Sequence, residues 1–215
     1  MERIDEAELL RRYAAGERDF NGLDLSRSRA RLSGVNLSGV NLSEANLGSA
    51  VLDEADLSEA SLRNAWLNGA ILERVNLSGA NLESANLEAV YIRDANLSRA
   101  NLRNVWFAYA FAQRSNFTGV NLSGAILHET SLDNALLIGA DLQGAELDQA
   151  GLSDANLSGA NLSGTILKEA DFDNANLTNA NLRAANIEDC FLAKAIFCNT
   201  IMPDGSIANN ISGYE

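Results

Sequence analysis

The 215-residue chain has one proline, one histidine and two cysteines, and it lacks a long apolar run. The two cysteines, Cys190 and Cys198, fit no metal-ligand spacing and make a poor disulfide framework, so we expect two free thiols. No apolar stretch approaches the roughly 18 residues of a membrane span, and the charged N-terminus has no signal-peptide core. These absences predict a cytoplasmic protein that does not enter a membrane.

Positive charge is also scarce, because 16 lysines and arginines face 29 acids and the net charge is -13. Binding of nucleic acid needs a surplus of cations near the phosphates, so nucleic acid is not expected as a direct ligand. A protein partner with a basic surface suits this charge better. Residues 1–31 hold equal numbers of acids and arginines, so the whole negative charge belongs to the rest of the chain.

A large apolar residue stands at every fifth position from Leu32 to Phe197, and only Ala112 breaks the rule. We call these the inward positions. The side chain two residues before each of them is small or medium, as at Ala45 and Val75. Steps of five residues scatter side chains around an α-helix and alternate them across a strand. The pattern therefore predicts a solenoid that turns a corner every five residues.

Turn residues support these corners. Ten of the 16 glycines, including Gly34 and Gly164, fall two residues after an inward position, and Asn or Asp often replaces glycine there. A positive φ is cheap for glycine and tolerable for asparagine, as a corner residue requires.

The repeating units "ANLSG", "ADLSE", "ANLES" and "ADLQG" resemble the A(D/N)LXX signature of pentapeptide repeat proteins, and the likeness covers most of the chain. This resemblance implies an all-β solenoid, a right-handed quadrilateral β-helix with four pentapeptides per coil and no cofactor. The end segments "LLRRYAAGERDFNGLDLS" and "IMPDGSI" are similar to those of cyanobacterial members.

Three segments are expected. Residues 1–16 form a short capping helix with an apolar side, ended by Gly16, which covers the open first coil. Residues 17–202 form the β-helix. Phe20 and Leu25 are five residues apart but two residues out of phase with Leu32, which predicts a two-residue insertion within "SRSRARL". Pro203 stops the repeat, and residues 203–215 read as a loose tail. Either this tail folds over the apolar last coil, or the coil stacks on a second copy, so a monomer and an end-to-end homodimer both stay open.

Residues 20 apart stack in a four-sided coil, which sorts the outward residue before each inward position into four columns. Two adjacent columns are polar almost throughout, and the other two carry nearly all the outward apolar residues. The acids follow the apolar residues: these two faces hold 15 acids and five bases, against five and four on the polar faces. We therefore expect one acidic, partly aromatic side and one amide-rich side.

The stretch "NVWFAYAFAQRSNF" gathers five aromatic residues. Trp106 and Phe111 are outward on this reading, while Phe107 and Phe117 point inward from opposite walls beside Ala112. Either their rings fill the space that Ala112 leaves, or a bulge tucks Phe111 inward in place of Ala112.

No catalytic or metal-binding residue is expected. The one histidine, His128, stands at an outward corner and reads as an ordinary surface residue. Paired carboxylates need a cleft that a convex leucine-filled column does not provide, and the regularly spaced glycines form no phosphate loop. An enzyme is therefore not expected.

The preferred function is a scaffold that binds a protein through its acidic, aromatic side. The candidate partner-binding residues are Trp66, Ile71, Tyr91, Trp106, Tyr109, Phe111 and Ile126. The family resemblance implies two alternatives. One is mimicry of DNA towards gyrase, which the charge and rod shape favour but which the two neutral faces and the lack of a long projecting loop disfavour. The other is regulation of cell differentiation through a transcription factor.

Overall fold

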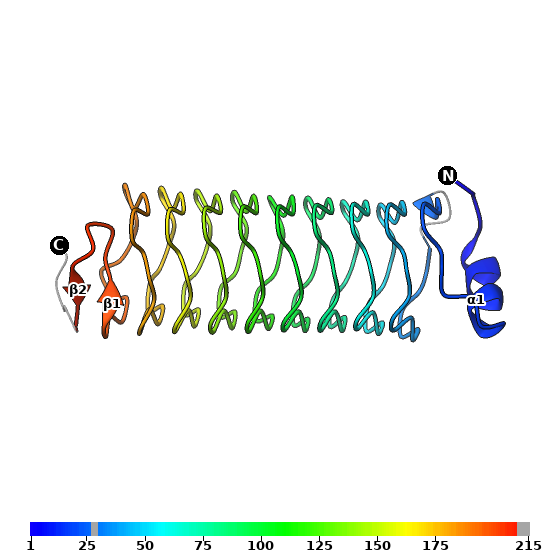
Figure 1. Cartoon of the computed structure of the whole chain (residues 1–215), viewed down its shortest axis with the longest axis horizontal. Coiled ribbons are helices and arrows are strands. Elements are labelled where there is room, and N and C mark those ends of the chain that lie inside the picture. Colours follow the sequence, from blue (N-terminus) through cyan, green and yellow to red (C-terminus); the bar gives the residue numbers. More distant parts are fainter. Residues whose placement is uncertain (27–29, 210–215) are drawn as a thin grey trace.

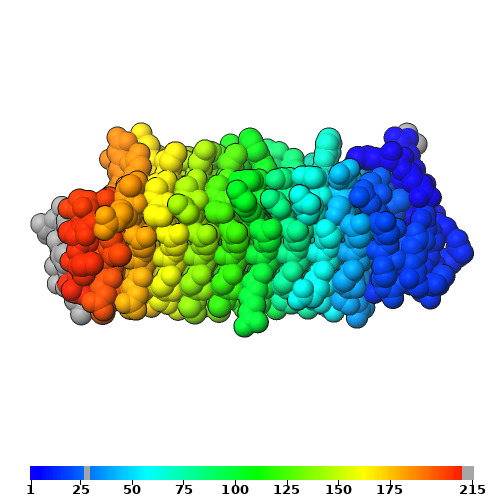
Figure 2. Space-filling view, in the orientation of Figure 1, coloured from blue at the N-terminus to red at the C-terminus, as the bar shows by residue number. Residues whose placement is uncertain are grey.

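The computed structural model describes residues 1–26 and 30–209, and these form a column of stacked coils (Figure 1). Helix α1, Glu6–Ala14, lies at the N-terminal end of the column. Strands β1, Thr200–Ile201, and β2, Ile207–Ala208, lie at the C-terminal end. The space-filling view shows an unbroken rod whose side chains lie in regular rows (Figure 2).

Parallel β-bridges between residues 20 apart hold neighbouring coils together, with four bridges in each coil. Ser61, for example, bridges Asn41 below it and Asn81 above it. Its N–H donates to Val40 O over 2.9 Å, and its carbonyl accepts from Leu42 N over 2.7 Å. The predicted solenoid of four-sided, 20-residue coils is confirmed. We call the bridging residue before each inward position the ladder position.

Each corner is a tight turn fixed by hydrogen bonds within and between coils. The carbonyl of Leu42 accepts from Ala45 N over 3.1 Å, and Glu44 between them has a φ of 58°. One positive φ before the closing donor is typical of a type II turn. The N–H of Glu44 donates to Arg63 O of the next coil over 2.7 Å.

Corner residues are more varied than glycine, asparagine and aspartate, because Glu, Arg, Ser, Ala and Tyr also adopt a positive φ there. The left-handed conformation costs an L-residue about 1–2 kcal/mol. The bonds to the neighbouring coil offset this cost, so the ladder rather than the corner side chain decides the backbone.

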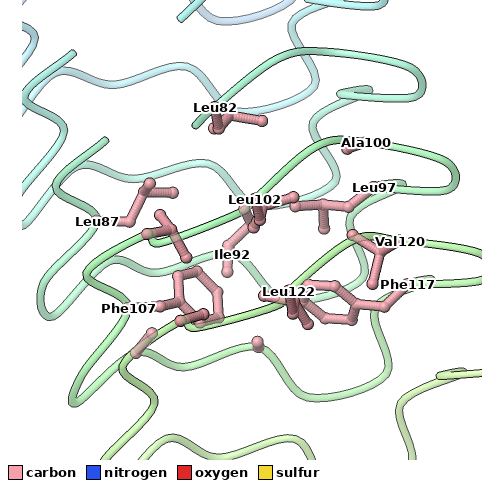
Figure 3. Close-up of a cluster of buried hydrophobic side chains, with 14 of the residues drawn as sticks. Leu82, Leu87, Ile92, Leu97, Ala100, Leu102, Phe107, Phe117, Val120 and Leu122 are labelled. Carbon is pink, nitrogen blue, oxygen red and sulfur yellow. The ribbon is translucent and has the colours of Figure 1, made fainter. Parts of the chain in front are cut away.

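The core is the line of inward side chains, which are all buried from Leu32 to Leu182. The rings of Phe107 and Phe117 reach into the coil from opposite sides (Figure 3). They meet edge to face, with 6.2 Å between ring centroids and 79° between planes. Ala112 keeps its inward place and its regular bond to Ser131 O, while Phe111 is only half-buried. The bulge hypothesis is therefore wrong, and the two rings pack across the undersized position.

Helix α1 covers the first coil as expected. Asp5 caps it by accepting Glu8 N over 2.9 Å, and the chain leaves it at Gly16, whose φ is 96°. Leu9 is fully buried against the core. The first coil is two residues longer than the others, since Asp19 bridges Asn41, which confirms the predicted insertion in length. The insertion was predicted within residues 26–32, and residues 27–29 of this stretch lie outside the described residues.

The C-terminal segment folds back on the column. Strand β2 pairs antiparallel with β1, with Thr200 opposite Ala208, and Ala208 is buried. The turn between them passes through Pro203 and Gly205, and Met202 N donates to Ser206 O over 2.8 Å. The expectation of a loose tail is therefore wrong for residues 203–209, and residues 210–215 lie outside the description. Within the described chain, no helix is long and apolar enough to cross a membrane.

Replacing Ala112 by leucine tests the aromatic packing of the core. Because the rings of Phe107 and Phe117 occupy the adjacent space, we expect A112L to lower the free energy of unfolding by about 1–3 kcal/mol. The triple variant F107L/A112L/F117L restores leucine at all three inward positions and should recover most of that loss. Urea denaturation followed by circular dichroism measures both. An A112L protein as stable as the wild type would show that the rings leave the space empty.

Candidate protein-binding surface

Two adjacent faces of the column carry the candidate residues. The tryptophan face consists of the ladder positions Asn46, Trp66, Asn86, Trp106, Ile126, Glu146, Ile166 and Asn186 with the turn residues that follow each of them. The tyrosine face consists in the same way of Val51, Ile71, Tyr91, Phe111, Ser131, Gly151, Asp171 and Phe191. The edge that they share, here the shared corner, is formed by Ser49, Gly69, Ala89, Tyr109, Glu129, Gln149, Glu169 and Asp189.

The structure brings all seven predicted binding residues together over four successive coils. We call them the aromatic patch: Trp66, Ile71, Tyr91, Trp106, Tyr109, Phe111 and Ile126. The two tryptophans have 54% and 45% of their surface exposed, and Tyr109 at the shared corner has 47%. Ile71 and Tyr91 are exposed as well, whereas Phe111 and Ile126 are half-buried.

Two rings of the patch form a stack that the sequence pattern did not specify. Tyr91 and Phe111 lie in successive coils with 5.0 Å between centroids and 12° between planes. The guanidinium of Arg93 lies 5.3 Å from the Phe111 centroid and 6.0 Å from that of Tyr91. Such cation–π contacts stabilise exposed rings by about 0.5–1 kcal/mol. The stack therefore holds part of the patch in one conformation.

Three arginines border the patch on the tyrosine face, and each has a carboxylate partner. Arg74 contacts Glu54 at 2.9 Å, and Arg93 contacts Glu73 at 3.3 Å. Arg114 donates to Asp94 at 2.6 Å, and this hydrogen bond lowers the pKa of the Asp94 carboxyl. Sequence reasoning missed these arginines, although Arg74 and Arg114 stand 40 residues apart in one column.

Buried hydroxyls support two turns beneath the patch. Ser115 Oγ donates to Ile92 O over 2.6 Å and accepts from Ala95 N over 3.0 Å, so it enters the turn that follows Tyr91. Thr130 Oγ1 donates to Phe107 O over 2.7 Å, in the turn that carries Tyr109. Both hydroxyls come from the next coil.

The two remaining faces use their polar side chains internally. On these asparagine faces, Asn81 Oδ1 accepts Glu83 N of its own turn over 3.1 Å and Asn101 Nδ2 of the next coil over 3.1 Å. Six of the seven patch residues, all but Tyr109, occupy the same ladder position, but their side chains have no acceptor for the turn N–H. In the turn after Ile71, Glu73 N donates instead to Asp53 Oδ1 over 3.0 Å. Each of the other five gives up a hydrogen bond that contributes about 0.5–1.5 kcal/mol.

On the two faces that acids and aromatics share, most of the acids lie in the coils beyond the aromatic patch. Between residues 46 and 115, these faces hold five acids and three arginines; between residues 126 and 194, they hold ten acids and two lysines. The ten acids are Glu129, Asp133, Glu146, Asp148, Asp154, Glu169, Asp171, Asp173, Glu188 and Asp189. The side expected to be acidic and aromatic thus divides into an aromatic half nearer the N-terminus and an acidic half nearer the C-terminus.

His128 lies at the junction of these halves and faces two carboxylates. Its Nε2 is 2.9 Å from Glu146 and its Nδ1 is 3.0 Å from Asp148. Among residues 1–26 and 30–209, no group of three or more histidine, cysteine and acidic side chains is arranged to hold a metal ion. Both cysteines are free, and burial raises the pKa of the Cys190 thiol to about 11.

Other exposed apolar residues lie outside the predicted patch. Phe191, Ile196 and Ile207 are exposed near the C-terminal end, next to a cavity of about 450 Å³ lined in part by Cys190, Leu192 and Met202. A smaller pair, Leu136 and Ile138, interrupts an asparagine face.

The family model for pentapeptide repeats matches eight copies, over residues 30–69, 55–94, 70–107, 95–134, 115–154 and 155–192. The chain is a pentapeptide repeat protein. Among solved structures, this pentapeptide repeat protein is similar to HetL from the cyanobacterium Nostoc sp. strain PCC 7120, a pentapeptide repeat protein involved in heterocyst differentiation regulation. The two share 32% identity over 95% of this chain and 100% of HetL, with a TM-score of 0.66.

Full-length QnrB1, a plasmid-mediated fluoroquinolone resistance protein, is 19% identical over 94% of this chain and 90% of its own, with a TM-score of 0.50. At this identity the likeness shows the fold alone. No curated protein sequence matches the chain.

Fluorescence tests the exposure of the patch, because the chain has only two tryptophans. We expect an emission maximum close to that of free tryptophan and efficient quenching by acrylamide in the native protein. The single variants W66F and W106F should each leave one quenchable indole. A blue-shifted, protected emission from either variant would place its remaining tryptophan in the interior.

Proposed function

We propose that this pentapeptide repeat protein is a non-enzymatic scaffold that binds a partner protein through the aromatic patch. The observation that carries the proposal is the presence of aromatic residues instead of asparagine at three ladder positions. Trp66, Trp106 and Tyr91 stand where asparagine would close the turn, and they expose their rings instead. A position that forgoes stabilisation and exposes apolar surface is better explained by binding than by folding.

The residue types and the rigidity of the surface support this function. Trp and Tyr are enriched among residues that dominate binding energies, and four such side chains lie close together in the aromatic patch. The backbone beneath them is fixed by bonds to both neighbouring coils. Trp106 donates to Ala85 O and accepts from Leu87 N of the preceding coil, and Phe107 N donates to Ile126 O of the next coil. A preorganised surface loses little conformational entropy when a partner binds.

We infer regulation of cell differentiation as the finer role, with a transcription factor or another regulatory protein as the partner. Its support is the 32% identity to HetL over nearly the full length of both chains. We also propose that the protein is cytoplasmic and that its coils wind in the right-handed sense of the family. The apolar C-terminal end around Phe191 and Ile207 stays the surface for a homodimer if the protein is not a monomer.

Affinity capture tests the proposed scaffold. The purified wild type is immobilised beside W66A/W106A and a matched control, L136A/I138A, which removes two exposed apolar side chains from an asparagine face. We expect at least one protein from a cyanobacterial lysate to be retained by the wild type and the control and to be lost, about 100-fold, with W66A/W106A. Equal retention by all three proteins would contradict the proposal.

Mimicry of DNA is the alternative that a gyrase supercoiling assay decides. Duplex DNA carries a negative charge every 1.7 Å or so of its axis, whereas most of the net negative charge here lies on two faces of one half of the column. We therefore expect no change in supercoiling at micromolar protein. Inhibition or protection of gyrase at that concentration would favour mimicry over the scaffold.

A further inference from the structure

The shared corner changes character once along the column. From Ser49 to Tyr109 it carries no charge, and from Glu129 to Asp189 it reads Glu, Gln, Glu, Asp. All eight residues have a positive φ, which directs them outward in one row. The change falls directly after Tyr109, at the end of the aromatic patch.

We propose that the partner docks in one orientation, with an apolar surface on the aromatic patch and an adjoining basic surface on Glu129, Glu169 and Asp189. This inference rests on the proposed function and specifies the partner's chemistry. The occupant is a protein that presents lysines or arginines beside an apolar surface, rather than a nucleic acid or an anionic membrane, which these carboxylates repel.

The acids of the corner are available for a partner. Glu129 and Asp189 are exposed, and neither has a side-chain hydrogen bond or an ion pair within the described chain. Glu169 is exposed and accepts one hydrogen bond, from Gln149 Nε2 over 2.7 Å. Asp154, at the next corner, is exposed and equally without such a contact.

The coils of the patch offer a basic partner surface less than the acidic coils do, because their arginines already neutralise three of the carboxylates. Arg74, Arg93 and Arg114 border the patch, and each has its own carboxylate at 2.6–3.3 Å. A partner shifted towards the N-terminal end would bring its cations against these arginines and lose the free acids. Charge complementarity of this kind fixes register and raises the association rate more than it adds to affinity alone.

Coil spacing sets the pattern that the partner must match. Glu129 and Glu169 are two coils apart and Asp189 is one coil further, which corresponds to about 10 Å and then about 5 Å along the axis. A partner with cations at those separations can neutralise the row.

Two double variants test the orientation. E129Q/E169Q removes two acids of the shared corner, and the control E44Q/E59Q removes two from other corners. Glu59 lies at the corner opposite the shared corner, and Glu44 lies where an asparagine face meets the tryptophan face. All four glutamates are exposed and have φ values between 52° and 60°. The probe is the protein that the wild type retains and W66A/W106A loses, purified and titrated by calorimetry at 50 mM and 300 mM NaCl. We expect E129Q/E169Q to weaken binding about 10-fold at low salt and less at high salt, with under 2-fold for the control.

The outcomes separate the two proposals. If E129Q/E169Q binds like the wild type while W66A/W106A does not bind, the orientation is overturned and the scaffold function stands. If W66A/W106A loses no partner, both fail.

Carbodiimide crosslinking gives a second reading that does not depend on affinity. It joins a carboxylate to a lysine amine in direct contact as an amide, while the reagent takes up the water that is released. We expect crosslinks from Glu129, Glu169 or Asp189 to partner lysines. Crosslinks confined to Glu44, Glu59 or the acids beside the patch arginines would overturn the orientation.

Discussion

The hydrogen-bond ladder between residues 20 apart is the constraint on which the rest of the structure depends. Each ladder residue donates to the coil below and accepts from it, as Ser61 does with Val40 and Leu42. The same stacking fixes the corners, so even Glu44 and Tyr109 adopt a positive φ. Because every coil after the first has the same length, side chains that are 20 residues apart stay in one row along the whole molecule. The faces of the molecule are therefore a direct consequence of backbone pairing.

This regularity gives each column one chemical role. The asparagines close their own turns and bond to one another from coil to coil, which commits their amides to the fold. The aromatic patch departs from that role in four coils, and buried hydroxyls from Ser115 and Thr130 enter the turns beneath it. Departures from an otherwise repeated solution mark the surface that we assign to binding. The axial change from paired arginines to free acids then gives that surface a direction.

Much of the fold was predictable because its determinants are local and repeated. The five-residue period, the capping helix ended by Gly16 and the longer first coil all followed from the spacing of apolar and turn residues. The C-terminal hairpin was missed, although Pro203, Asp204 and Gly205 form a strong turn signal between two apolar pairs. The place of each patch residue was also predictable from a 20-residue register. The Tyr91–Phe111 stack with Arg93 was not, since it depends on side-chain rotamers that no spacing rule determines.

Disulfide trapping tests the ladder register most directly. Stacked ladder residues lie about 4.8 Å apart, within the Cα range of about 4.4–6.8 Å that a disulfide tolerates. In a chain whose Cys190 and Cys198 are replaced by serine, S61C/N81C should oxidise to an intramolecular disulfide, because the two positions bridge each other. S61C/N76C places the thiols on adjacent faces and should stay reduced under the same conditions. A disulfide in S61C/N76C but not in S61C/N81C would contradict the register, and with it the existence of a common binding surface.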